Sequence, residues 1–309
     1  MRALVTGGRG FVGRWLGGNL EHEGDEVVVI DAETDVTDER AVEAAIGASV
    51  PDAVYHLAAR THVGESWREP LEVLRVNTLG TAAVLVAARR AAPDATVLVV
   101  SSSEVYGALG PEELPVAESA PLRPATPYAA SKAAAEQVAL QAWLGYGQRV
   151  VVARPFNHVG PGQSTAFAVP ALARRVLEAR RDGRRELVVG TVTTRRDFTD
   201  VRDVVRAYRL LVERAEPGGV YNVCSGHDLA ISDVAARLMA LAGVELRMVT
   251  DPDLVRPVDT PVLRGDPSRL VEATGWAPRI PLDETLQDVL RGLERDVAGE
   301  GGQAPGVTR

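Results

Sequence analysis

Tyr128 and Lys132 are the residues with the clearest chemical potential. They lie four positions apart in the segment PYAASK, and Thr126 and Pro127 are typical of a helix cap and a first helical position. On a helix, this spacing places the phenol and the ammonium on one face. A phenol has an ordinary pKa of about 10, and a neighbouring positive charge favours the phenolate. The pair therefore predicts a group that transfers a proton.

A run of serines followed by an acid lies upstream, in the stretch SSSEVYG. Alternate residues of a strand face the same side, so Ser102 and Glu104 are expected to project together toward Tyr128 if the strand stays regular there. A carboxylate in that place can abstract a proton next to a carbonyl group, or it can only hydrogen-bond near the site. Glu104 alone does not decide between the two.

Three glycines, Gly7, Gly10 and Gly13, lie between the first strand pattern and a helix pattern. Glycines there permit a tight turn and let backbone N–H groups approach a pyrophosphate, whose charge the helix N-terminus favours. Asp31 ends the next strand pattern; it suits the two ribose hydroxyls of NAD and would repel a 2′-phosphate. We expect NAD(H) to be preferred, while Arg9 in the loop keeps NADP(H) as the alternative.

The elements that must position these residues alternate regularly over the first half of the chain. Apolar runs separated by amphipathic stretches predict a parallel sheet with helices on both faces. The runs are ALVTG, EVVVID, DAVYHLAA, TVLVVSSS and RVVVARPFN. We predict an α/β fold: a Rossmann-type doubly wound parallel sheet with a smaller mixed C-terminal lobe that binds the substrate.

The alternation of strand and helix patterns becomes less regular after about residue 160, and the domain boundary is predicted there. Residues 1–160 are expected to form the NAD(P)-binding core, and 161–296 mainly the substrate lobe, with 191–235 returning to the core. The strand YNVCSG and the helix ISDVAARLMALAG are both assigned to the core. The tail 297–309 is Gly-rich and poor in large apolar residues, so it is expected to be disordered.

Composition limits the class of protein and its partners. The 309 residues are 46% hydrophobic, and no apolar run is expected to reach the roughly 18 residues of a membrane span. A net charge of −8 argues against nucleic acid or an anionic membrane as a partner. The single cysteine, Cys224, fits a cytoplasmic location, and the five scattered histidines predict no metal site.

The order of these motifs resembles one family. GxxGxxG, HLAA, Asn77, SSS…YG and YxxxK are together similar to the extended short-chain dehydrogenase/reductases, the epimerase/dehydratase family. The resemblance implies that Ser102, or alternatively Ser103, binds the reacting group. It also implies that Tyr128 transfers the proton and that Lys132 holds the nicotinamide ribose. The cofactor contacts that it implies are Gly7, Gly10, Phe11, Val12, Gly13, Asp31, Asp35, Val36, Leu57, Ala58, Ala59, Asn77, Tyr128, Lys132 and Pro155.

The segment RPFNHVGPGQ most resembles GDP-4-keto-6-deoxy-D-mannose reductases and, less closely, GDP-mannose 4,6-dehydratases. By that resemblance Asn157 contacts the substrate diphosphate, and Asp259 takes a ribose hydroxyl. Arg196 and Arg256 would bind phosphate or ribose oxygens, for which the planar fork of arginine is suited. In the alternative interpretation, Arg196 only balances nearby aspartates and Arg256 is a solvated loop residue. His62 is a further catalytic candidate.

The resemblance implies a reductase that transfers hydride from NAD(P)H to C4 of a nucleoside diphosphate 4-keto-6-deoxyhexose. The long basic insertion that the dehydratases carry after the second strand is absent, which favours the reductase. A 4,6-dehydratase or 4-epimerase that uses Glu104 is the first alternative, and a non-catalytic NAD-binding sensor is the second. The family also implies a homodimer, formed through EPLEVLRVNTLGTAAVLVAARR and the Tyr128 helix.

Overall fold

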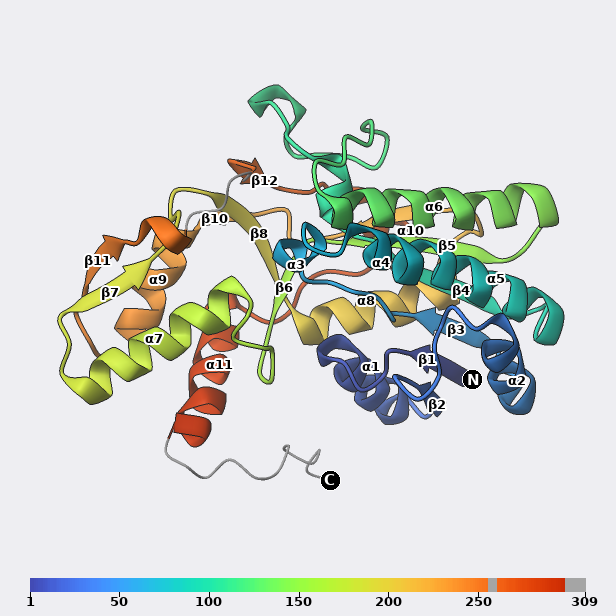
Figure 1. The fold of residues 1–309 in the computed structure, drawn as a ribbon, viewed down its shortest axis with the longest axis horizontal. Coiled ribbons are helices and arrows are strands. Elements are labelled where there is room, and N and C mark those ends of the chain that lie inside the picture. Colours follow the sequence, from blue (N-terminus) through green and yellow to red (C-terminus); the bar gives the residue numbers. More distant parts are fainter. Residues whose placement is uncertain (255–259, 298–309) are drawn as a thin grey trace.

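A six-stranded sheet in which every pairing is parallel forms the centre of the larger body (Figure 1). The computed structural model describes residues 1–254 and 260–297. Strand order reverses between β1 and β3, as in doubly wound folds, so the predicted fold class is confirmed. Across the sheet the strands are β2 (Glu26–Ile30), β1 (Arg2–Thr6), β3 (Ala53–His56), β4 (Thr96–Val100), β5 (Val150–Pro155) and β9 (Val220–Val223).

Helices cover both faces of this sheet because its strands are apolar on both sides. In β1, Ala3 and Val5 belong to one buried cluster, and Leu4 between them belongs to the other. The first cluster is covered by α1 (Phe11–His22), α8 (Val201–Arg214) and α10 (Ser268–Thr274). The second is covered by α2 (Glu39–Ser49), α5 (Gly80–Ala91) and α6 (Pro127–Tyr146).

A long helical run leads into α5. After α3 (Val63–Ser66), helix α4 (Pro70–Leu74) and the π-helical turn Arg75–Leu79 continue directly into α5. Within the described part of the chain, Pro70–Ala91 is long and apolar enough to cross a membrane by length and composition, with a mean hydropathy of 1.4. This differs from the expectation, stated from the sequence, that no apolar run reaches the length of a membrane span. The run packs on α2 and α6, and buried core helices pass the same test.

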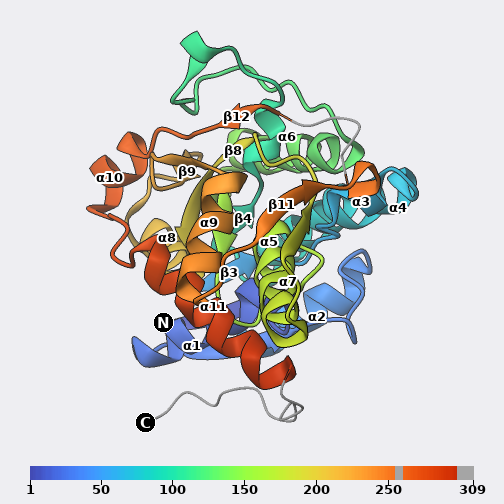
Figure 2. The same cartoon turned by 90° about the vertical axis from the view of Figure 1, so that its left-hand side faces the viewer.

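The lobe lies beside the core, and Figure 2 looks onto its helices α7 (Ala168–Asp182), α9 (Ile231–Leu241) and α11 (Leu282–Val297). Its outer strands β7 (Glu186–Val189) and β11 (Arg247–Thr250) form a parallel pair. A small second sheet is made by β6 (Asn157–Val159), β8 (Arg195–Asp200), β10 (Asp228–Ala230) and β12 (Val262–Leu263). Short 3-10 helices span Ser103–Tyr106, Pro111–Glu113 and Pro252–Leu254.

Two helices pack in a different part of the protein from the one that the sequence predicts. The sequence assigns α9 to the core, but Val234, Ala235 and Leu238 bury it against α7 and α11 in the lobe. Helix α10, expected in the lobe, packs on the core, where Leu270 and Trp276 are fully buried. Periodicity shows that a helix has an apolar face, but it does not show which element covers that face. The predicted tail, from residue 298 onward, lies outside the described residues.

Candidate functional site

The loop between β1 and α1 brings backbone unusually close to backbone. Gly7 has a φ of 69°, and a Cβ on it would lie 2.9 Å from the backbone of Ala58. A Cβ on Gly13 would lie 2.3 Å from the Gly7 carbonyl oxygen. Gly10 is the N-cap of α1 and has no side chain to occupy the first helical N–H groups. These residues therefore form a cradle that fits the pyrophosphate of a dinucleotide.

Asp31 lies just beyond β2, next to this loop. Its carboxylate accepts hydrogen bonds from the backbone N–H of Arg9 at 2.6 Å and from that of Ala32 at 2.8 Å. The Arg9 guanidinium pairs with Glu33 at 2.7 Å, and both side chains are exposed. The end of β2 is thus followed by the carboxylate of Asp31. Arg9 lies beside it, and its guanidinium is paired with the exposed Glu33.

Asn77 has a clear structural role. Its side-chain oxygen accepts from the Arg60 backbone N–H at 2.8 Å, and its amide donates to the Arg60 carbonyl at 3.1 Å and to the Ser131 hydroxyl at 2.8 Å. Asn77 is buried, and its hydrogen bonds connect the segment after β3 to the helix that carries Tyr128. Ser131, one residue before Lys132, was not singled out from the sequence, although it lies inside the YxxxK motif.

The other expected cofactor residues lie around the carboxyl ends of the strands. Asp35 accepts hydrogen bonds from Thr37, which hold the pKa of its carboxyl below the ordinary value. Val36 is buried against Gly80. The roles of these residues in cofactor binding stay predictions. Phe11 and Val12 begin α1, Leu57, Ala58 and Ala59 follow β3, and Pro155 ends β5.

The start of α6 matches its sequence prediction. Thr126 is the N-cap and accepts a hydrogen bond from the Ala129 backbone N–H at 3.0 Å, and Pro127 is the first helical residue. Tyr128 and Lys132 therefore lie one turn apart on a helix whose beginning is fixed by its cap. Both side chains are buried.

Tyr128 meets the serine run through Ser102. The Ser102 hydroxyl lies near enough to the phenol of Tyr128 to lower its pKa, which favours Ser102 over Ser103 as its partner. Burial raises the pKa of Tyr128 to about 12, although Ser102 opposes this change. The phenol is therefore protonated at neutral pH.

Burial, rather than the neighbouring Lys132 ammonium, dominates the pKa of Tyr128. The Lys132 ammonium donates to the Val100 carbonyl at 2.8 Å, at the end of β4. Burial lowers the pKa of Lys132 to about 8, and the charge of Glu136 opposes that decrease. The phenol is more strongly affected by loss of water than by this ammonium, so its pKa rises.

Glu104 does not continue the strand. Strand β4 ends at Val100, and Ser103–Tyr106 forms a 3-10 helix that Ser102 caps by accepting from the Glu104 backbone N–H at 3.2 Å. Ser102 and Glu104 are expected to project to the same side only if the strand stays regular, and the chain is not a strand there. Glu104 is half-buried and still lies near enough to Tyr128 for its charge to raise the pKa of the phenol.

The substrate residues of the described chain occupy two different settings. Asn157 is exposed at the start of β6. Arg196 is buried, and its guanidinium donates to the Thr260 carbonyl at 2.7 Å and to the Arg195 carbonyl at 2.9 Å. It therefore fixes the chain near residue 260. Arg256 and Asp259 lie outside the described residues.

His56 has a structural role in the core, whereas His62 lies at the start of a short helix. His56 is buried between the hydroxyls of Thr6, at 2.8 Å, and Thr81, at 3.0 Å, as expected of a core residue. Burial lowers its pKa to about 3. His62 caps α3 by accepting from the Glu65 backbone N–H at 3.2 Å, and its ring lies 6.3 Å from that of Phe167. No catalytic contact of His62 is seen among the described residues.

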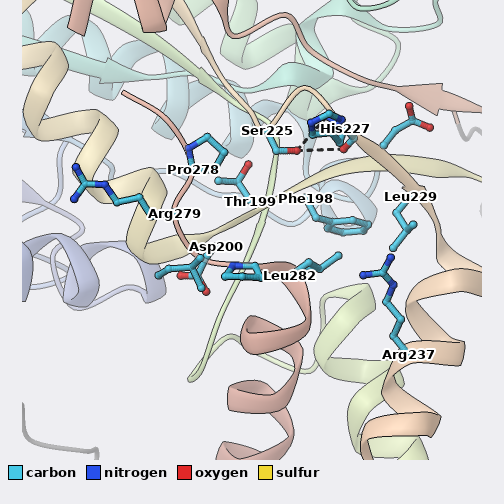
Figure 3. Close-up of a pocket in the computed structure, with 13 residues that line it drawn as sticks. Phe198, Thr199, Asp200, Ser225, His227, Leu229, Arg237, Pro278, Arg279 and Leu282 are labelled. Carbon is cyan, nitrogen blue, oxygen red and sulfur yellow. Dashed lines mark hydrogen bonds between the residues drawn. The ribbon is translucent and has the colours of Figure 1, made fainter. Parts of the chain in front are cut away.

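A hollow of about 390 Å³ lies where β8 meets the segment before α11 (Figure 3). Its acids are neutralised by arginines: Asp200 pairs with Arg202, and Asp228 with Arg195. It contains none of the expected site residues. The hollow is lined by Phe198, Thr199, Asp200, Ser225, His227, Asp228, Leu229, Arg237, Pro278, Arg279, Ile280, Pro281 and Leu282.

Comparison with known proteins places the chain in a family. The model of the GDP-mannose 4,6-dehydratase family matches residues 32–289, which is more than half of the chain. The chain belongs to this family. The expected membership of the epimerase/dehydratase group and the expected NAD(P)-dependent enzyme acting on a nucleotide sugar are thereby confirmed.

The chain is also similar to individual proteins. The chain is 38% identical to GDP-6-deoxy-D-mannose reductase from Pseudomonas aeruginosa, over 97% of this chain and 99% of the relative. The solved structure of RMD from Pseudomonas aeruginosa, complexed with NADPH, matches 96% of this chain and 99% of its own with a TM-score of 0.89 at 38% identity. The UDP-glucose 4-epimerase of Thermus thermophilus, in complex with NAD, matches 95% of this chain and 99% of its own with a TM-score of 0.85 at 30% identity.

Proposed function

We propose that the protein reduces the 4-keto group of a GDP-4-keto-6-deoxyhexose with NAD(P)H. The observation that carries this proposal is the buried Ser102–Tyr128 pair, in which the phenol stays protonated at neutral pH. A reduction needs a proton donor at the carbonyl oxygen, whereas an enzyme that begins by oxidising C4 needs a base there. The similarity to GDP-6-deoxy-D-mannose reductase supports the same direction and the guanine nucleotide.

In this proposal Ser102, Tyr128 and Lys132 divide the tasks of the reaction. Bound NAD(P)H supplies the hydride that C4 of the sugar accepts. Ser102 orients the carbonyl oxygen, and Tyr128 delivers its phenolic proton to that oxygen as the carbonyl is reduced. Lys132 holds the nicotinamide ribose, and its charge favours the phenolate that Tyr128 becomes. Orientation of the reactants supplies much of the remaining rate enhancement.

Two substrates offered in parallel test the proposal. GDP-4-keto-6-deoxymannose with NADH or NADPH should consume the reduced cofactor, which absorbance records. GDP-mannose with NAD⁺ should remain unchanged by mass. Loss of water from GDP-mannose without net change of cofactor would make the protein a dehydratase, and the proposed direction would be wrong.

Substitution of Glu104 by glutamine should leave the reductase largely active. The charge of the Glu104 carboxylate raises the pKa of the Tyr128 phenol, and a reduction requires no base at C5. We expect kcat to change by less than about three-fold, whereas loss of a general base would lower it by about 10²–10⁴-fold. Steady-state kinetics of Glu104→Gln with the 4-keto substrate measures the difference. A loss in the larger range would assign Glu104 to the chemistry.

Cofactor choice should depend on Arg9 and Glu33. Asp31 favours a free ribose diol, while the exposed Arg9–Glu33 pair can open and offer the guanidinium to a 2′-phosphate. Glu33→Gln should raise kcat/KM for NADPH by about two- to five-fold and leave that for NADH unchanged. Arg9→Ala should lower kcat/KM for NADPH alone. Equal changes with both cofactors would show that the pair does not act on the phosphate.

We also propose that the protein is a cytoplasmic homodimer. Exposed apolar side chains gather on the two helical segments that the family resemblance assigns to the interface. Leu71 is 80% exposed and Leu79 is 59% exposed on the Pro70–Ala91 run, and Leu144 is 73% exposed on α6. Sedimentation equilibrium measures the state directly, and a monomer at micromolar concentration would contradict the proposal.

A further inference from the structure

A buried ion pair joins the middle of the proposed catalytic helix, α6, to strand β5. Glu136 is fully buried and Arg154 is 5% exposed, and the Arg154 Nη2 and Glu136 Oε2 atoms are 2.7 Å apart. The Arg154 Nε adds contacts at 3.0 and 3.2 Å to the two carboxylate oxygens. The Ser101 hydroxyl donates to the same carboxylate. The carboxylate of Glu136 is therefore held by two other elements, β5 and the end of β4.

The same arginine extends the network toward the serine run. Its Nη1 donates to the Tyr106 hydroxyl at 2.9 Å and to the Glu118 carbonyl at 3.1 Å. Tyr106 in turn donates to the side-chain oxygen of Asn222 at 2.6 Å, on β9. The network thus joins α6, β4, β5, β9 and the 3-10 helix after β4 through buried polar groups.

Four members of the network are close neighbours in sequence of proposed site residues. Glu136 lies one helical turn beyond Lys132, and Ser101 directly precedes Ser102. Tyr106 ends the 3-10 helix that contains Glu104, and Arg154 directly precedes Pro155 on β5. A shift of the pair would therefore move the segments that carry the hydroxyl, the phenol and the ammonium.

Stability alone does not require such a pair. Replacing a buried ion pair by apolar residues of similar volume is often neutral or stabilising, because taking two charges out of water is costly. The same fold has another pair at the amino ends of the strands, where Asp25 is held by Arg209 at 2.8 Å and by the N-terminal amine at 2.9 Å. That pair lies at the sheet edge opposite the site and provides a matched comparison.

The charge of Glu136 also acts on Lys132. Burial removes water from the ammonium and lowers its pKa to about 8, and Glu136 is the group whose charge raises the pKa again. His56 is neutral at working pH because its pKa is lowered to about 3. Glu136 on α6 and His56 on β3 are the charged or titratable groups that interact electrostatically with Lys132, which lies one turn from Tyr128. Beyond them, Arg154 on β5 pairs with Glu136, and the charge of Glu104 acts on Tyr128.

We propose that Glu136 is a positioning residue for hydride transfer: bound to Arg154 and Ser101, it fixes the segments that carry Ser102, Tyr128 and Lys132. The inference rests on the proposed function insofar as the Ser102, Tyr128 and Lys132 set carries the reaction. It applies equally to a reduction and to a dehydration that begins with hydride transfer.

Glu136→Gln tests the proposal because it keeps the shape of the side chain and removes its charge. We expect kcat to fall by roughly 10- to 100-fold, with KM for the nucleotide sugar changed much less. Lys132 loses the charge that raises its pKa, so it deprotonates at lower pH. The alkaline limb of the pH profile should therefore move down by roughly one pH unit. The assay uses whichever of the two substrates the wild type converts.

Two further variants keep the test decisive. Ser101→Ala removes one bond to the carboxylate, leaves the ion pair intact, and should lower kcat by about two- to ten-fold if Glu136→Gln does not fold. Asp25→Asn breaks the comparison pair and should leave kcat and the alkaline limb as in the wild type. A folded Glu136→Gln protein with wild-type kcat and pH profile would overturn the proposal. The same kinetic change in Asp25→Asn would also overturn it.

A cofactor-binding measurement separates this inference from the proposed function. Fluorescence titration with NADH reports the Lys132 contact with the ribose without any sugar substrate. In Glu136→Gln, NADH affinity should weaken at a lower pH than in the wild type. If the wild type converts neither sugar nucleotide, the proposed function fails, while this titration still decides the role of Glu136. Identical pH dependence in the two proteins would refute that role.

Discussion

Tyr128→Phe is expected to abolish most of the turnover while the protein keeps its fold and its cofactor. The phenol is buried and protonated, and its hydroxyl meets Ser102 at the place where the carbonyl oxygen is expected. Phenylalanine fills the same space and removes only the proton donor. One positioned proton donor contributes about 10²–10⁴-fold, so kcat/KM with the 4-keto substrate should fall by that amount. Stopped-flow oxidation of NADH measures it.

The control for this prediction lies on the same helix. Tyr146 ends α6 with an exposed side chain, and the Arg89 guanidinium lies 4.4 Å from the centre of its ring. Tyr146→Phe removes an equivalent hydroxyl far from the site and should leave kcat and the affinity for NADH unchanged. If Tyr128→Phe kept more than about a tenth of the wild-type kcat, another group would have to supply the proton.

The core of the fold could be predicted from the sequence because its signals are local. Continuous apolar runs mark strands buried on both faces, and the structure distributes Ala3, Leu4 and Val5 between two clusters accordingly. Thr126 and Pro127 similarly mark the start of α6 through short-range hydrogen bonding and a fixed φ. Each of these signals depends on neighbours within a few residues.

One of the errors arises where a partner distant in sequence decides the outcome. Helix α9 has an apolar face that fits either body, and its burial against α7 and α11 depends on residues on both sides of it in the chain. The end of β4 at Val100 has a local cause instead: Ser102 caps a 3-10 helix that begins at Ser103, before Glu104. Alternation along a strand cannot predict where the strand stops.

The charge network could be predicted only in part. Glu136 lies four residues beyond Lys132, so the sequence alone places the two on one helix face. Its partner Arg154 lies on the next strand, and Tyr106 and Asn222 come from two further elements. The sequence does not predict the burial of Glu136, because a charged residue on a helix is usually solvated. Only the packed structure shows that the arginine compensates it.

Gly13→Ala should abolish tight cofactor binding, although it adds a single methyl group. The new Cβ would lie 2.3 Å from the Gly7 carbonyl oxygen and 2.5 Å from Gly8 Cα, and both are backbone atoms. Backbone cannot move aside as the end of a flexible side chain can, so the loop must shift away from α1. That loop supplies the N–H groups that approach the pyrophosphate. A displacement of about 1 Å at such a site costs on the order of 10²-fold, and we expect the Kd for NADH to rise accordingly.

Gly17→Ala is the matched control because it makes the same substitution one turn further along α1. A Cβ on Gly17 meets nothing within 4 Å, and alanine is favoured over glycine inside a helix by about 0.5–1 kcal/mol. This variant should therefore bind NADH as the wild type does and melt at a slightly higher temperature. Fluorescence titration and thermal unfolding with and without NADH measure both variants. Equal NADH affinity in Gly13→Ala and Gly17→Ala would mean that the close backbone approach does not serve the cofactor, and the glycine loop would lose its proposed role.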